Sequence, residues 1–359
     1  MNTTTEPLSL SHKRKKSAEI RLLEKLVRML GTQVCACSVN DLVAYYKAPS
    51  SQITVLKFMA GQIERLKSQQ CFGTASNYQR AYNSLAAFLK SSSENIDIPF
   101  LMMNEDFVIR YSNWLEGRNI LRNSISFYMR IWRAVYNKAV KERLVEQSFP
   151  FENVYTGIDH TCKRAVGEKI ILDLLNLDLS NKPALMLSRD LFVFSYCTRG
   201  MAFVDIAFLR KNNISNGVIS YYRQKTGQRL QVRVETCVQM LIERYAEQTQ
   251  GSPYVFPLLD SEENEVAYRQ YQSALGCHNR RLKELGEMLG VALPLSSYTP
   301  RHTWATAARN HNVPVSVISA CMGHTSEKTT MIYLASLENS VMDQANSELV
   351  RDINRCVSF

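Results

Sequence analysis

The sequence predicts a mainly α-helical (α+β) protein of about two domains that contains one small antiparallel sheet. Its 359 residues exceed the roughly 150 residues that one domain commonly contains. Hydrophobic residues make up 45% of the chain and charged residues 21%, which is typical of a protein with packed cores. Apolar residues recur at helical spacing through most of the chain, whereas strict alternation is confined to residues 218–234. Neither a βαβ alternation nor an internal repeat is present.

Residues 1–47 are predicted to form a basic N-terminal arm and a leading helix. The arm ends in the run His12-Lys13-Arg14-Lys15-Lys16, and apolar residues take helical spacing from Ala18 to about Met29. Residues 48–150 are predicted to form a helical domain. Its expected helices cover residues 55–66, a stretch that Ser76 and Asn77 open, residues 107–115, and a stretch that Asn123 and Ser124 cap and that runs to Ala139.

Basic side chains gather on the last of these helices. Between Arg118 and Arg143 there are seven basic residues and a single acid, Glu142. A solvated helix face usually interleaves acids with bases, so this pattern favours a helix that contacts phosphates. The formal net charge of +10 points the same way, although a basic surface kept for solubility is an equal alternative. The residues expected to contact DNA are Arg118, Arg122, Arg130, Arg133, Lys138, Lys163 and Arg164.

The second half of the chain is predicted to begin after a linker at residues 151–169. Helical spacing covers residues 170–177 and 183–197, and two alternating runs then flank Lys225-Thr226-Gly227 as a β-hairpin. Helices resume at Val238 and continue into a C-terminal stripe. This tail helix packs either in its own domain or on a neighbouring protomer. Its apolar residues are Leu337, Val341, Ala345, Leu349 and Ile353.

Composition argues against several other classes of protein. Nine cysteines are scattered, and the closest pair, Cys35 and Cys37, lacks the C-x2-C spacing of a zinc site. We therefore expect reduced thiols, no metal and no cofactor. No apolar run approaches the ~20 residues that cross a bilayer, and the first ten residues contain no apolar signal region. These features predict a cytoplasmic protein.

Three short motifs near the C-terminus are weak singly and specific in combination. They are Arg301-His302-Thr303-x-Ala305-Thr306, then Gly323-His324-Thr325, then Thr329-Thr330-x-x-Tyr333. In this order and spacing they resemble the tyrosine recombinase (phage integrase) family, and their details resemble the subgroup of Bacteroides-type mobile elements and invertible loci. Lys225-Thr226-Gly227 resembles the lysine-bearing β-turn of that family. The segments 77–81 and 125–130 resemble its helical core-binding (SAM-like) domain, and residues 170–359 would then be its catalytic domain.

The resemblance implies a chemistry for these residues. A tyrosine of this family attacks the scissile phosphodiester and forms a 3′-phosphotyrosine, which leaves a free 5′-hydroxyl and conserves the bond for rejoining. Tyr333 matches that nucleophile, and Arg301 matches the second arginine that binds the phosphate. His324 matches the late histidine that donates to the phosphate, and Lys225 the lysine that protonates the departing 5′ oxygen. The implied partners are DNA recombination sites and further copies of the chain, assembled as a tetramer.

The sequence departs from the family pattern at two positions. The first family arginine sits three residues before a helix acid, but the residue three before Asp205 is Ala202. Arg199 lies one helical turn earlier and is the expected replacement. Tyr298 stands where the family has a histidine, and we expect it to play a supporting role. Other assignments are less central: His302 reads as structural, and Arg223 and Arg229 are rivals of Lys225.

These departures keep two alternatives open. One is a catalytically idle DNA-binding regulator that retains the recombinase fold, and the other is an enzyme resembling a type IB topoisomerase. The joint presence of Tyr333, Arg301, His324 and Lys225 argues against the first. The basic helical domain and the C-terminal tail favour recombination between sites, by integration, excision or inversion, over the second.

Overall fold

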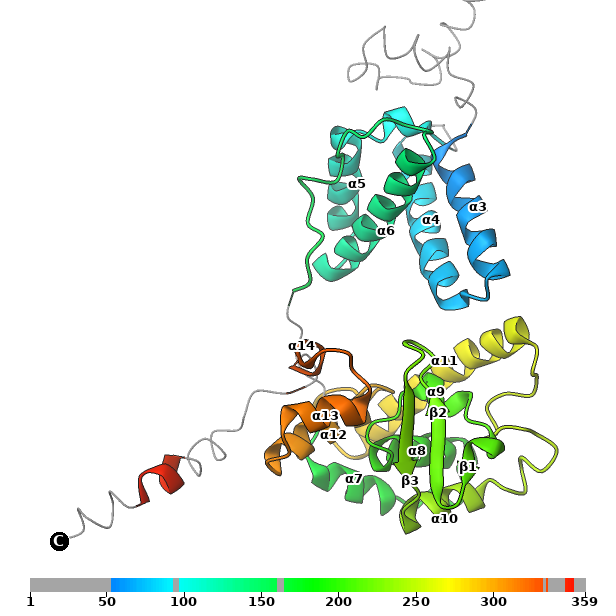
Figure 1. Cartoon of the computed structure of the whole chain (residues 1–359), viewed down its shortest axis with the longest axis vertical. Helices are drawn as coiled ribbons and strands as arrows, with labels where there is room; N and C mark the ends of the chain where they lie inside the picture. Colours follow the sequence, from blue (N-terminus) through cyan, green and yellow to red (C-terminus); the bar gives the residue numbers. More distant parts are fainter. Residues whose placement is uncertain (1–52, 93–96, 160–164, 332–333, 335–345, 352–359) are drawn as a thin grey trace, which may run out of the picture. The chain divides into compact units, whose positions relative to one another are not determined.

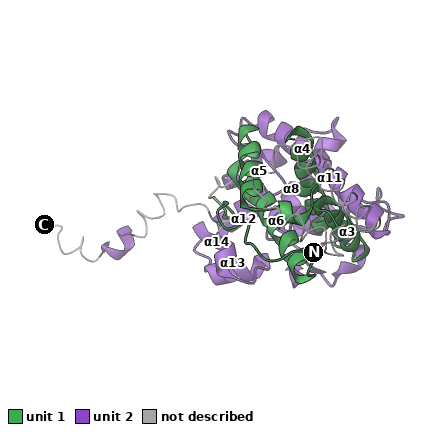
Figure 2. Ribbon diagram, turned by 90° about the horizontal axis from the view of Figure 1, so that it is seen from above, with its two compact units in different colours: residues 1–160 green, residues 161–359 purple. Residues whose placement is uncertain are grey.

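The computed structural model describes residues 53–92, 97–159, 165–331, 334 and 346–351 (Figure 1). The predicted arm and leading helix, Lys163, Arg164, Tyr333 and most of the tail stripe lie outside these residues. The chain divides into two compact units, residues 1–160 and 161–359 (Figure 2). Each unit is described by itself.

The described part of the first unit is helical. It contains α3 (Val55–Ser68), α4 (Phe72–Ser92), the 3-10 helix η3 (Phe100–Met102), α5 (Glu105–Gly117) and α6 (Arg122–Lys141). The Asn104 side chain caps α5 by accepting the Phe107 N–H at 3.0 Å. One apolar core joins all four α-helices, and its largest fully buried side chains are Trp132, Tyr136, Phe107, Met59, Leu85, Leu115 and Met129.

Two predicted helix starts in this unit are wrong. Helix α4 begins at Phe72, a turn before Ser76, because the Cys71 carbonyl already accepts the Ala75 N–H. Helix α6 begins at Arg122, and Asn123 is not its cap. The Asn123 side chain instead holds the loop that follows the helix, because it accepts the Asp159 N–H at 2.7 Å and donates to the Asp159 carbonyl at 3.1 Å.

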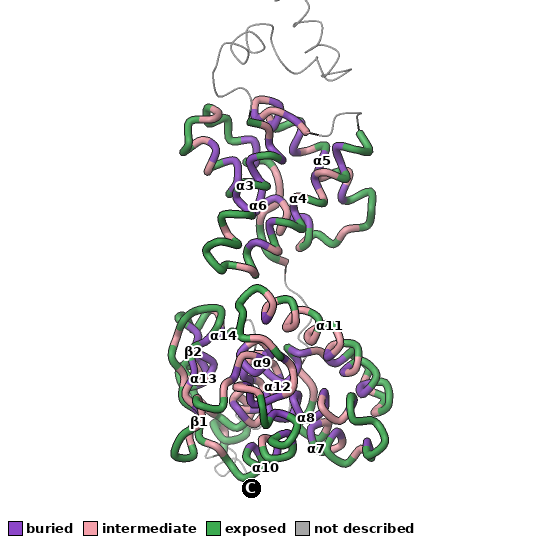
Figure 3. The backbone as a smooth tube through the Cα atoms, turned by 90° about the vertical axis from the view of Figure 1, so that its right-hand side faces the viewer, coloured by how far each residue is buried: buried purple, intermediate pink, exposed green. Residues whose placement is uncertain are grey.

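The helix α8 (Pro183–Cys197) is central to the second unit. It contacts α7 (Glu168–Leu175), α9 (Phe203–Ala207) and α10 (Thr236–Arg244), and the 3-10 helix η4 (Lys211–Asn213) lies against the small antiparallel sheet. The chain continues with α11 (Asn264–Met288), α12 (Thr299–Asn310), α13 (Val315–Met322) and α14 (Glu327–Met331). Most of α8 is buried (Figure 3). Its Asp190 is fully buried. That carboxylate accepts from Arg189, Arg244 and Tyr245 at 2.7–2.9 Å, so its burial is compensated.

The predicted hairpin is confirmed within a three-stranded antiparallel sheet. Strands β1 (Ile214–Ser215), β2 (Val218–Tyr222) and β3 (Arg229–Arg233) lie in that order. Val218 pairs with Arg233 and Tyr222 with Arg229, so residues 223–228 form the connecting turn. Ile219 and Val232 face the core of the unit, whereas the turn at residues 223–228 consists of polar residues and one glycine. In the part of the chain that the structure describes, no helix has the length and apolar character needed to cross a membrane.

Candidate active site

The site begins where α8 ends in a left-handed turn. Arg199 and Gly200 both have positive φ, +61° and +70°, and the Gly200 N–H returns to the Ser195 carbonyl at 2.8 Å. This turn directs the Gly200 carbonyl at Arg301, whose Nη1 donates to it at 2.6 Å. Glycine is required here, since a Cβ at position 200 would lie 2.9 Å from the Arg301 Cα.

A second helix end meets the same arginine. Helix α13 ends at Met322, the next residue, Gly323, has φ +63°, and the His324 N–H bonds the Ser319 carbonyl at 3.0 Å. Arg301 Nη2 donates to the Met322 carbonyl at 2.6 Å and contacts His324 Nε2 at 3.0 Å. Arg301 is 2% exposed and belongs to α12. Its guanidinium therefore joins the ends of α8 and α13 to α12, and we call this cluster the Arg301 site.

His324 is neutral near pH 7 in this arrangement. A guanidinium can only donate, so Nε2 accepts from Arg301 and the ring proton is on Nδ1, which donates to Thr330 Oγ1 at 2.9 Å. Burial, together with the positive charges of Arg301, Arg223 and Lys225, lowers the pKa of His324 from 6.5 to about 4. To donate to a phosphate, as the family resemblance implies, Nε2 must first lose its contact with Arg301 and gain a proton.

The base of the hairpin contacts both α9 and the end of α13. Asp205, on α9 and 4% exposed, accepts the Gln224 N–H at 2.8 Å. Arg223 Nη1 donates to the Gly323 carbonyl at 2.5 Å, and Arg223 Nε lies 4.0 Å from Asp205 Oδ2. Burial raises the pKa of Asp205, while the Gln224 N–H and the guanidinium groups of Arg223 and Arg301 act in the opposite direction. Lys225 lies two residues after Arg223 and is exposed in the turn.

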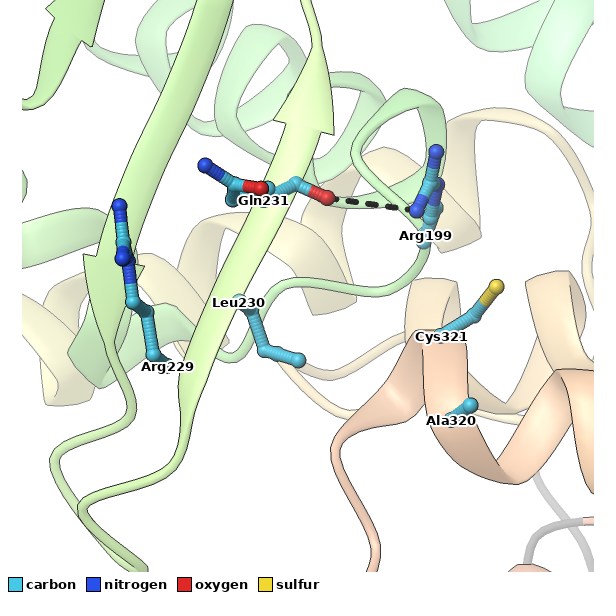
Figure 4. Close-up of a pocket in the computed structure, with 6 residues that line it drawn as sticks. All are labelled: Arg199, Arg229, Leu230, Gln231, Ala320 and Cys321. Atoms are coloured by element: carbon cyan, nitrogen blue, oxygen red, sulfur yellow. Dashed lines mark hydrogen bonds between the residues drawn. The ribbon is translucent and has the colours of Figure 1, made fainter.

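Arg199 lies at the edge of this arrangement. It is half-buried, and its Nη1 donates to the Gln231 carbonyl of β3 at 3.3 Å (Figure 4). It lines a cavity of about 320 Å³ between β3 and α13. The cavity is lined by Arg199, Arg229, Leu230, Gln231, Ala320 and Cys321.

The structure thus brings together some of the predicted site residues and leaves others apart. Arg301 and His324 are in contact, and Lys225 is near enough to act on the pKa of His324. Tyr298 precedes α12 and is 54% exposed. Tyr333 lies outside the described residues, but Thr330 bonds His324, and Leu334 is buried in a cluster with Ile318 and Met322.

Sequence reasoning missed the backbone acceptors of Arg301 and gave Arg223 only as a rival of Lys225. The two left-handed glycines in Arg199-Gly200 and Gly323-His324 were the available signal, because such residues end helices and expose carbonyl groups. No group of His, Cys, Asp and Glu suited to a metal ion occurs among the residues that the structure describes.

The basic residues of the first unit that were predicted to bind DNA are held in place by their neighbours. Arg118 lies over the Trp114 ring at 4.8 Å and Arg122 over the Tyr155 ring at 3.8 Å. Arg130 Nε donates to the Ser126 carbonyl, Arg133 Nη1 to Thr156, and Lys138 Nζ to Gln62 and Tyr78. Arg118, Arg122 and Arg133 are exposed, while Arg130 and Lys138 are half-buried.

Comparisons with known proteins agree on both units. Residues 54–154 match the model of the phage integrase SAM-like domain, and residues 171–340 match that of the phage integrase family. The tyrosine recombinases XerD of Pseudomonas aeruginosa and Pseudomonas putida are 20% and 22% identical to this chain. Each alignment covers 73% of this chain and 87% of the relative.

Solved structures share the fold. The Tn1549 transposon integrase in complex with a circular intermediate DNA has a TM-score of 0.57 and 17% identity, covering 84% of this chain and 99% of that chain. A lambda integrase tetramer bound to a Holliday junction has a TM-score of 0.56 and 11% identity, covering 89% of this chain and 88% of the other.

The close approach of Gly200 to Arg301 predicts the effect of adding one methyl group. Gly200→Ala should lower the free energy of unfolding by about 1–3 kcal/mol, from backbone strain and from the clash with Arg301. Gly217→Ala is the matched control, since Gly217 has φ +71° and open space around its Cβ position. Denaturant titration of both variants measures the difference. Equal losses would show that the contact with Arg301 is unimportant.

The depressed pKa of His324 predicts a dependence of stability on pH. As the pH falls from 6.5 to 4, the unfolded chain protonates this histidine and the folded chain does not, so the free energy of unfolding decreases. The contribution of His324 should be about 1–3 kcal/mol and should be absent from His324→Gln. Burial lowers the pKa of His278 to about 3, but His278 is present in both proteins and cancels in the comparison. Parallel stability curves for wild type and variant would contradict this prediction.

Proposed function

The chain belongs to the phage integrase family of tyrosine recombinases and is a site-specific DNA recombinase, and we propose that it acts through Tyr333 at the Arg301 site. The observation that supports this proposal best is the buried guanidinium of Arg301, which contacts His324 close in sequence to Tyr333. In the proposal, residues 48–150 form a DNA-binding domain and residues 170–359 the catalytic domain, joined by the linker 151–169.

Tyr333 attacks the scissile phosphorus in the first step. A bond forms between its phenolic oxygen and phosphorus while the phenolic proton passes to solvent, and the bond to the 5′ oxygen breaks as that oxygen receives a proton from the general acid. The product is a 3′-phosphotyrosine, and a 5′-hydroxyl that attacks it reverses the step. Two anchored neighbours in sequence support this role, since Thr330 bonds His324 and Leu334 is buried beside Met322.

Arg301 stabilises the charge that develops on the non-bridging oxygens. Its guanidinium stays protonated at any working pH, and its contacts with Gly200, Met322 and His324 hold it in one orientation before DNA binds. A phosphodiester anion at this site also favours protonation of His324, which opposes the effect of the neighbouring cations on its pKa.

Lys225 is the proposed general acid. The departing 5′ oxygen is a strongly basic alkoxide unless it receives a proton, and an exposed ammonium on a hairpin turn can supply one. Tyr298 and Arg199 are proposed as additional hydrogen-bond donors at the edge of the site. No step of this mechanism uses a metal or another cofactor.

Double-stranded DNA is the proposed substrate, and a homotetramer on paired sites is the proposed assembly. The basic residues of α6 and the segment containing Lys163 and Arg164 supply cations for phosphate contacts. The solved relatives provide precedent, because one is bound to a circular intermediate DNA and another is a tetramer on a Holliday junction. The C-terminal tail is proposed to pack in its own protomer or on the next.

Replacing Tyr333 by Phe tests the nucleophile. On a nicked suicide substrate that carries the recombination site, the wild-type chain should accumulate covalent protein–DNA adduct and Tyr333→Phe none, because the phenylalanine ring has no oxygen. Adducts are measured on denaturing gels, and fluorescence anisotropy should show DNA affinity within about two-fold of wild type. Equal adducts would exclude Tyr333, and binding without adduct in both proteins would favour the idle regulator.

A sulfur atom in place of the bridging 5′ oxygen tests Lys225. Lys225→Ala should slow cleavage of ordinary DNA by about 10²–10⁴-fold. The same variant should cleave the sulfur-containing DNA nearly as fast as wild type, because a thiolate is far less basic than an alkoxide (a cysteine thiol has a pKa of about 8.5) and leaves without a proton. Arg229→Ala, on the same hairpin, is the control: any defect that it has should be equally large on both substrates. A defect of equal size on both substrates would remove Lys225 from the role of general acid.

A further inference from the structure

We propose that Arg223, on the β2–β3 hairpin, binds the scissile phosphate together with Arg301. It would thereby take the role of the first family arginine, whose usual position is occupied by Ala202 in this chain. The inference rests on the proposed function, and it assigns the role to a different residue from Arg199, which the sequence favours. It follows from where the cations lie around Asp205 and His324.

Because residue 202 is alanine, no arginine at that position can balance the charge of Asp205 on α9. Asp205 is buried one helical turn after Ala202, and a buried carboxylate needs hydrogen bonds and a positive charge to remain ionised. The Gln224 N–H supplies one hydrogen bond. Arg223 supplies the charge, since its Nε lies 4.0 Å from Asp205 Oδ2, and it arrives from the hairpin instead of from α9.

The guanidinium of Arg223 has unused donor capacity. It is 7% exposed, and its Nη1 donates to the Gly323 carbonyl. Its Nε is buried without a hydrogen-bond partner, because 4.0 Å from Asp205 is too far for a hydrogen bond. A guanidinium carries five N–H donors and cannot lose its charge, so an anion with several oxygens is the natural acceptor for those that remain.

Arg223 and Arg301 approach the same short segment. Arg301 donates to the Met322 carbonyl and Arg223 to the Gly323 carbonyl, the two residues that immediately precede His324. Both guanidinium groups also act electrostatically on His324 and on Asp205. Two forked cations beside one imidazole match the non-bridging oxygens of a phosphodiester, to which forked donors bind well.

Arg199 is placed differently. It is only half-buried, and its side chain lies toward β3, where it bonds the Gln231 carbonyl and faces a cavity that Arg229 also lines (Figure 4). A contact with a flanking phosphate suits that position. The assignment has a further consequence: because Arg223 is two residues before Lys225, one hairpin then carries both the charge-neutralising group and the general acid.

A substrate that lacks the charge of the scissile phosphate tests this assignment. In a methylphosphonate, a methyl group replaces one non-bridging oxygen and removes its negative charge, so an arginine that neutralises this charge becomes dispensable. With saturating DNA, Arg223→Ala should slow cleavage of the ordinary strand by about 100-fold or more relative to wild type. On the methylphosphonate strand, the difference between the two proteins should shrink to less than about 10-fold.

Two further variants complete the experiment. Arg223→Lys keeps a positive charge beside Asp205 and loses the fork, so it guards against misfolding and should show a smaller defect that the methylphosphonate also relieves. Arg199→Ala should slow both substrates by less than about 10-fold. Circular dichroism and DNA affinity verify that each variant is folded.

The possible outcomes separate this inference from the proposed function. Relief of the Arg223 defects on the methylphosphonate strand supports the inference. Equal defects of Arg223→Ala on both strands would show that Arg223 is structural and would overturn the inference. Wild-type rates for Arg223→Lys, together with a defect of Arg199→Ala that the methylphosphonate relieves, would also overturn it. A wild-type chain that cleaves neither strand would refute the proposed function itself.

Discussion

The candidate site depends on the burial of one permanent positive charge, the guanidinium of Arg301. Moving such a group out of water is costly unless acceptors replace the water, and three acceptors do so: the carbonyls of Gly200 and Met322 and the ring of His324. These acceptors come from the ends of two other helices. The same interactions that compensate the burial therefore also fix the positions of α8, α12 and α13 relative to one another.

The nature of those acceptors matters for function. The two carbonyls and the imidazole are neutral, so they orient Arg301 without cancelling its charge. The nearby carboxylate, Asp205, is instead engaged by the Gln224 N–H and lies beside Arg223. A cationic site held by neutral groups retains its attraction for an anion, and its orientation is set before the anion arrives.

The sequence allowed much of the fold to be predicted, because the dominant signals are local. Helix 183–197 and the hairpin around Lys225 follow directly from apolar spacing and a turn containing glycine. The start of α6 could not be predicted, because Asn123 suits a helix cap and a loop contact equally well. Its partner, Asp159, is 36 residues away in the sequence. Asn123 makes this contact because the loop that contains Asp159 packs against the start of the helix.

By itself, the sequence determined the type of chemistry: the order Arg301, His324, Tyr333 and the lysine on a glycine-containing turn identify the family. Tertiary structure decided which groups surround the arginine and that His324 is neutral. It also decided which cation faces Asp205, because Arg223 is 18 residues from Asp205 and 100 residues from Gly323 along the chain. Contacts over such separations arise from helix and sheet packing, which leaves no periodic signal in the sequence, whereas motifs and turns are local and do.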